Sequence, residues 1–180
     1  MAASAKVMLM LITLLLLAVG PATAATSFPT LDRIASGVAG RNIEATCPTP
    51  DEWATHKFVR STSGPINAFT WFSGDGRPLF MWLSPRACGM LVLLAVDPDD
   101  RHGSRLNGFG TRREQAAALL SLLHEAVHMS GVRDEGEAEC RAVRAIAGAA
   151  LELGVVRAYV LEALALSVHR LKPPAYQEVC

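Results

Sequence analysis

Two histidines and a glutamate at fixed spacing are the residues of this sequence best suited to chemistry. They are His124, Glu125 and His128, in the run His-Glu-Ala-Val-His. Positions four apart share one face of a helix, so both imidazoles can reach one ion, and Zn²⁺ readily takes neutral histidine nitrogen. Glu125 follows the first ligand, where it can accept a proton from water activated by the metal. The motif predicts a zinc site with Glu125 as general base.

A third protein ligand must come from elsewhere in the chain. The helix that carries the motif is expected to end at Gly131, within a turn of His128, which leaves the metal accessible. Acidic residues return directly afterwards, and they are the nearest source of an oxygen ligand. These residues are Asp134, Glu135, Glu137 and Glu139.

The motif resembles the zinc helix of the zincin metallopeptidases. The run from His124 to Asp134, with Gly131 between them, is similar to the extended metzincin signature that ends in Asp, as in small secreted neutral proteases of the snapalysin type. That similarity implies Asp134 as the third ligand. Metzincins also carry a methionine turn further along the chain, and no methionine follows Met129.

The acidic run 134–139 resembles the gluzincin arrangement instead, in which a second helix supplies a Glu with another acid four residues later. This resemblance implies Glu135 as the third ligand and Glu139 as the partner of a ligand histidine's second nitrogen. We take Glu135 as the ligand and Asp134 as the alternative, because the methionine turn is missing and Asp134 suits a helix N-cap. The order of these motifs also resembles that of a group of secreted actinobacterial proteins, mainly over residues 111–146.

Helices are expected to position these side chains. Thr111 and Glu114 form a capping-box pattern, and the apolar spacing that follows predicts a helix up to Gly131. A second helix is predicted from a cap at Asp134 to about residue 153, and a third over about 155–171.

The preceding part of the chain is predicted to be mixed. Residues 31–39 are weakly helical, and 43–65 look irregular. Residues 66–83 are expected to form a β-hairpin and 85–96 a short helix. An extended peptide bound at the metal would need a nearby edge strand, which we expect within 77–83. The fold class is therefore α+β: a small zincin-like single domain, mostly helical with a short antiparallel hairpin, in which two long helices follow the zinc helix.

The other aromatic residues and histidines have ordinary interpretations. The tryptophans are expected to fill the core and the remaining histidines to lie on the surface. Donors to a reaction oxyanion are sought in Tyr159 and the arginines of 133–144, without a choice between them. The tryptophans are Trp53, Trp71 and Trp82, and the histidines are His56, His102 and His169.

The N-terminus predicts export. A lysine, an apolar run of about 13 residues and a small-x-small site indicate a signal peptide over 1–24 and a mature domain over 25–180. The run is shorter than the roughly 20 residues that span a bilayer, so no stable membrane anchor is expected after cleavage. Four cysteines in an exported chain predict two disulfides. Three pairings are possible, and we favour Cys47–Cys88 and Cys140–Cys180 because they tie neighbouring segments without crossing.

The charge composition excludes one class of function. The chain has 17 basic and 17 acidic residues, so it lacks the positive field of a nucleic-acid-binding protein. We expect a secreted zinc-dependent hydrolase, most simply a small metallopeptidase that acts on a peptide or protein substrate. The alternative is a secreted non-catalytic zinc-binding or structural module. An open groove at the metal would favour the enzyme, and a capped metal the module.

Overall fold

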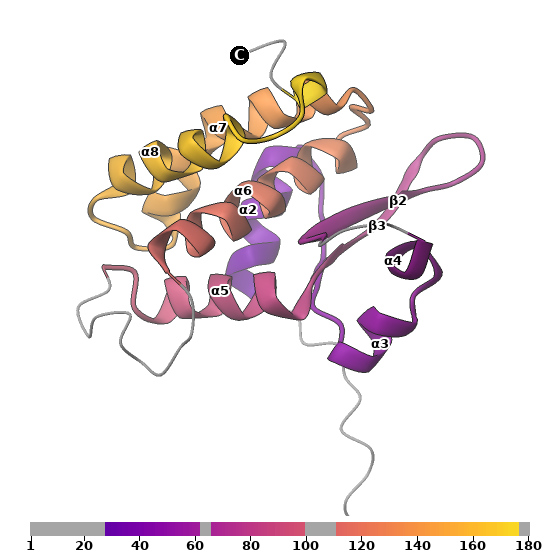
Figure 1. Ribbon diagram of the computed structural model, residues 1–180, viewed down its shortest axis with the longest axis horizontal. Helices are drawn as coiled ribbons and strands as arrows, with labels where there is room; N and C mark the ends of the chain where they lie inside the picture. The colour runs from indigo at the N-terminus through magenta and orange to yellow at the C-terminus, as the bar shows by residue number, and fades with distance from the viewer. Residues whose placement is uncertain (1–27, 62–65, 100–110, 177–180) are drawn as a thin grey trace, which may run out of the picture.

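A long helix, α6, forms the centre of the molecule. The computed structural model describes residues 28–61, 66–99 and 111–176. Four helices pack around α6, and a small sheet lies against it on the remaining side (Figure 1). The helices are α2 (Pro29–Ala39), α5 (Pro85–Val96), α6 (Arg112–Met129), α7 (Glu135–Glu152) and α8 (Ala158–His169). The predicted mixture of helix and sheet, with two helices after α6, is confirmed.

Local capping signals fix the N-terminal ends of α5, α6 and α7. The Thr111 side chain accepts a hydrogen bond from the backbone of Glu114, whose own side chain accepts one from the Thr111 N–H, which confirms the capping box of α6. Asp134 caps α7, and Ser84 caps α5, as predicted. The third predicted helix is shorter than expected, since α8 covers only Ala158–His169.

The sheet has three strands in the order β1-β3-β2. Strands β2 (Ala68–Phe72) and β3 (Pro78–Leu83) form the predicted antiparallel hairpin. Strand β1 (Ala45–Thr46) pairs in parallel with β3 on its other side. The expectation of an edge strand within 77–83 is therefore wrong: β3 is central and β2 lies at the edge. The reason is a two-residue pairing between distant segments, which no local pattern reveals.

The segment expected to be irregular contains more than β1. Two short helices, α3 (Pro50–Thr55) and α4 (Lys57–Ser61), also lie within it. Helix α3 begins with a capping box between Thr49 and Glu52 and a proline in its first turn. These two local signals favour a helix and outweigh the prolines, which had suggested an irregular segment.

The two faces of the sheet differ. On the inner face, the Thr70 hydroxyl donates to the backbone carbonyl of Glu125 on α6, and the Phe72 ring meets His128 edge-on. On the outer face, aromatic rings from β2 and β3 pack against residues of α3 and α4. The expectation that the tryptophans fill the core is wrong, because all three belong to this outer cluster and Trp71 is 39% exposed. The cluster consists of Trp53, His56, Phe58, Phe69, Trp71, Phe80 and Trp82.

One predicted disulfide is confirmed. Cys47 and Cys88 are bonded at 2.01 Å and tie the segment after β1 to α5. Cys140 is also disulfide-bonded, but its predicted partner, Cys180, lies outside the described residues, as does the predicted signal peptide 1–24. Within the described ranges, no helix has the length and apolarity needed to cross a membrane.

Candidate metal centre

The last two turns of α6 are buried on all sides. From Leu122 to Met129 every residue is buried, including His124 (6% exposed), Glu125 (8%) and His128 (4%). Leu122, Leu123, Ala126 and Met129 of this stretch belong to the hydrophobic core. Polar side chains in such a place are unfavourable unless they find partners. The hydrogen-bond and ion-pair partners of these three residues therefore indicate the function of the site.

The two histidines converge with Glu135, the first residue of α7. His124 Nε2 lies 3.0 Å from His128 Nε2 and 3.0 Å from Glu135 Oε2. His128 Nε2 lies 3.5 Å from the same carboxylate oxygen. The three ligand atoms lie within 4.8 Å of one another and could hold one metal ion. Glu135 is about half exposed, so the group opens to solvent on its side.

The outer nitrogens of both rings have acceptors. His128 Nδ1 lies 2.7 Å from the carbonyl oxygen of Val132, which can only accept, so Nδ1 donates. Gly131, at φ +100°, turns the chain so that this carbonyl faces the ring. His124 Nδ1 donates to Glu139 Oε2 over 2.9 Å. In both neutral rings the Nε2 lone pair is thereby directed into the convergence point.

Such a geometry favours a cation. Two nitrogen lone pairs and a carboxylate oxygen repel one another unless a proton or a metal ion lies between them. Despite burial, hydrogen bonds to Glu135 and Glu139 raise the pKa of His124 to about 9, while both histidines lower the pKa of Glu135. Two imidazole nitrogens, on rings whose outer nitrogens are hydrogen-bonded, and one carboxylate oxygen are a donor set suited to a transition metal.

Asp134 is directed elsewhere. Its side chain accepts a hydrogen bond from the backbone N–H of Glu137 at 2.7 Å and so caps α7. Glu137 pairs with Arg141 one turn further along. Among the acids weighed from the sequence, the structure therefore brings Glu135 to the two histidines and Glu139 to the outer nitrogen of His124.

Glu139 is completely buried and has further partners. Its Oε1 lies 3.3 Å from His169 Nδ1, and its Oε2 accepts from Lys172 Nζ at 2.6 Å. The expectation that His169 is a surface residue is wrong, because it is 6% exposed at the end of α8. His56 is half-buried within the aromatic cluster, and His102 lies outside the described residues.

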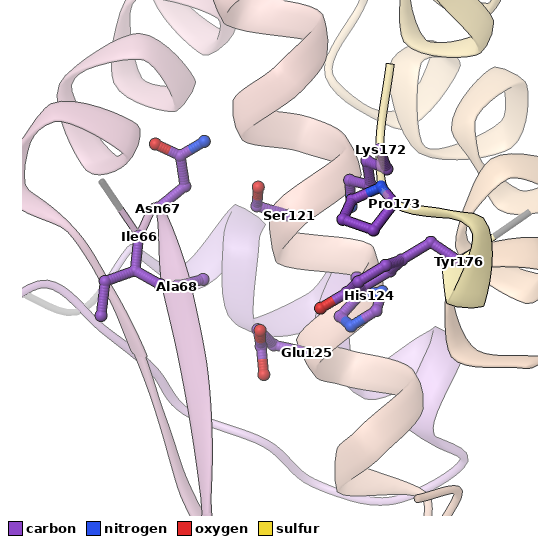
Figure 2. Close-up of a pocket in the computed structure, with 9 residues that line it drawn as sticks. All are labelled: Ile66, Asn67, Ala68, Ser121, His124, Glu125, Lys172, Pro173 and Tyr176. Atoms are coloured by element: carbon purple, nitrogen blue, oxygen red, sulfur yellow. The ribbon is translucent and has the colours of Figure 1, made fainter. Parts of the chain in front are cut away.

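A groove adjoins the convergence point. It is a cavity of about 290 Å³ between the start of β2 and the C-terminal segment, with α6 as its floor (Figure 2). Ala68 lies on the strand side, Tyr176 on the opposite side, and the Glu125 side chain projects between them. Burial raises the pKa of Glu125, which strengthens it as a proton acceptor.

Tyr176 was missed by the sequence analysis. It lies in a single 3-10 turn, Pro174–Tyr176, and its ring centre is 5.9 Å from that of His124. Burial and the carboxylate of Glu135 raise the pKa of its hydroxyl. Tyr159, a candidate oxyanion donor from the sequence, is 65% exposed on α8. No local pattern distinguishes Tyr176, since it reaches the site through the fold of the chain after α8.

Comparison of the chain with protein-family models, with curated proteins and with solved structures found no match.

Proposed function

We propose that this protein is a secreted zinc-dependent hydrolase, most simply a small metallopeptidase. The observation that carries the proposal is the convergence of His124, His128 and Glu135 with both outer imidazole nitrogens hydrogen-bonded. These donors suit Zn²⁺ and leave a position for water or substrate. When bound, Zn²⁺ would act as a Lewis acid toward water and a substrate carbonyl.

Glu125 would be the general base. It neighbours a metal ligand in the sequence, is not itself part of the converging group, and projects into the groove. Its raised pKa matches the task of taking a proton from water and passing it to a leaving nitrogen.

The groove supports an extended substrate. Strand β2 is the edge of the sheet next to α6, and its residue Ala68 lines the cavity that also contains Glu125. A peptide in an extended conformation can add to such an edge through main-chain hydrogen bonds. This arrangement favours a peptide or protein as the substrate class.

The alternative, a zinc-binding module without turnover, has one observation in its favour. Tyr176 packs against His124 and interacts with Glu135, so the C-terminal segment covers part of the site. The adjoining cavity is nevertheless large enough to admit several side-chain atoms, which favours the enzyme.

The substitution Glu125→Gln separates the two functions. Gln keeps the volume but cannot accept the proton, so we expect unchanged zinc content and a loss of peptide cleavage of roughly 10²–10⁴-fold. Zinc content is measured by atomic absorption and cleavage with a mixed peptide library. Glu44→Gln, at an exposed glutamate, is the matched control and should change neither quantity.

Three outcomes decide the proposal. Wild-type protein that binds zinc and cleaves peptides only when Glu125 is intact supports the enzyme. Zinc binding without any cleavage supports the module. Wild-type protein without affinity for zinc would reject both.

A further inference from the structure

The buried carboxylate of Glu139 is the point where three elements meet. Its Oε2 accepts from His124 Nδ1 of α6 at 2.9 Å and from Lys172 Nζ at 2.6 Å. Its Oε1 lies 3.3 Å from His169 Nδ1 of α8. The Glu139 side chain is 0% exposed, and a buried carboxylate needs both a compensating charge and hydrogen bonds.

Lys172 supplies the compensating charge. A histidine that ligates a metal through Nε2 is neutral, so His124 donates a hydrogen bond to Glu139 without balancing its charge. Lys172 brings a full positive charge to Oε2, the same oxygen that orients His124. The position of this oxygen, and with it the direction of the His124 ring, therefore depends on Lys172.

Lys172 also belongs to the segment that covers the site. Its Nζ lies 5.1 Å from the ring centre of Tyr176, and that ring lies 5.9 Å from the ring of His124. Figure 2 shows Lys172 and Tyr176 on the same side of the groove, with His124 beneath the tyrosine. Lys172 is thus linked to His124 in two ways: through the carboxylate of Glu139 and through the ring of Tyr176.

We propose that Lys172 is a positioning residue of the metal centre. Through Glu139 it holds His124 in the orientation that binds the metal, and it couples docking of residues 172–176 to metal binding. The inference rests on the proposed metal site, but not on catalysis. Lys172 has no place among the converging ligand atoms and acts through another residue.

A merely structural ion pair would behave differently. Its loss would lower the stability of the fold but leave the zinc affinity of the folded protein unchanged. Zinc affinity is therefore the quantity to measure, by competition with a chromophoric chelator on the full mature chain. The absorption spectrum of the Co²⁺-substituted protein reports the geometry of the ligands independently.

The first variant is Lys172→Met, which keeps the length of the side chain and removes its charge. We expect zinc affinity to fall by about 10–100-fold, as for other losses of an outer partner of a ligand histidine, and the Co²⁺ spectrum to change. Lys172→Arg keeps the charge and should recover most of the affinity. Lys57→Met, at an exposed lysine of α4, is the matched control and should bind zinc as the wild type does.

A double-mutant cycle with Glu139→Gln tests the coupling directly. In the E139Q background the buried charge is gone, so adding K172M should cost no further zinc affinity. The double variant removes the charge together with its partner, so this comparison holds even where K172M alone does not fold. A further loss of about tenfold in the E139Q background would overturn the proposal.

The outcomes also separate this inference from the proposed function. Wild-type protein that binds no Zn²⁺ rejects the metal site itself. Equal zinc affinities of wild type and folded K172M reject only the role of Lys172.

Discussion

Asp134 and Glu135, at the start of α7, have different roles, although the carboxylate of either residue could bind a metal ion. Asp134 accepts a backbone hydrogen bond at the N-terminus of the helix, and Glu135 faces the two histidines. The difference arises because an N-cap residue directs its short side chain back to the helix. The residue after it starts the helix and projects its longer side chain sideways.

Alanine substitutions at these positions should therefore have separate effects. Glu135→Ala should lower zinc affinity by more than the roughly 10–100-fold typical of an outer-partner loss, because it removes a proposed ligand. Asp134→Ala should keep zinc and lower the free energy of unfolding by about 1 kcal/mol through loss of the cap. Zinc titration and urea denaturation measure the two quantities. Retention of zinc by E135A together with its loss in D134A would exchange the two roles.

The hairpin of β2 and β3 depends on one glycine of its turn. Gly76 has a φ of +81°, and the guanidinium of Arg133 occupies the space where a Cβ would lie. Arg133 also lies over the ring of Phe72, at 5.8 Å from its centre, and Phe72 contacts His128. The turn, the loop before α7 and the inner face of β2 are thereby packed together.

Gly76→Ala should disturb this packing. A positive φ costs a residue with a Cβ about 1–2 kcal/mol, and Arg133 must also leave its place on Phe72. We expect the free energy of unfolding to fall by at least that amount in urea denaturation. Gly74→Ala in the same turn is the matched control, because its Cβ would meet open space. Equal stabilities of the two variants would contradict both the strain at position 76 and the displacement of Arg133.

The stability of the whole molecule should depend on pH and metal together. In the metal-free protein the pKa of His124 is raised from 6.5 to about 9. Its protonation therefore stabilises the fold fully below about pH 6.5, and this contribution, up to about 3 kcal/mol, is lost as pH rises through 9. The pKa of Glu135 is lowered, so its contribution is present above the ordinary carboxylate pKa and is lost only in acid.

A metal bound at the proposed site would displace the proton from His124, so metal affinity should rise with pH. We expect the gain in melting temperature on adding zinc to be larger at pH 8.5 than at pH 6.5. In excess chelator, the protein should become less stable over the same interval. Thermal unfolding followed by circular dichroism, with and without zinc, measures both. A zinc effect that is constant from pH 6.5 to 8.5 would contradict a protonated His124 in the metal-free state.

The sequence by itself determined the features that depend on neighbours along the chain. The capping box of Thr111 and the apolar spacing fixed α6, the Asp134 cap fixed the start of α7, and the turn residues fixed the β2–β3 hairpin. The four-residue spacing of His124 and His128 placed both rings on one face of α6, because helix geometry is local. The even number of cysteines predicted disulfides, and the preference for pairs that tie neighbouring segments favoured Cys47–Cys88.

The tertiary structure alone decided how distant segments meet. It made β3 the central strand, moved the tryptophans to an outer cluster, and buried His169 beside Glu139. It also brought Lys172 to a carboxylate 33 positions earlier in the chain. Such contacts depend on the angles at which helices pack and on the path of the chain after α8. Periodicity and capping describe single elements, so they contain no information about these contacts.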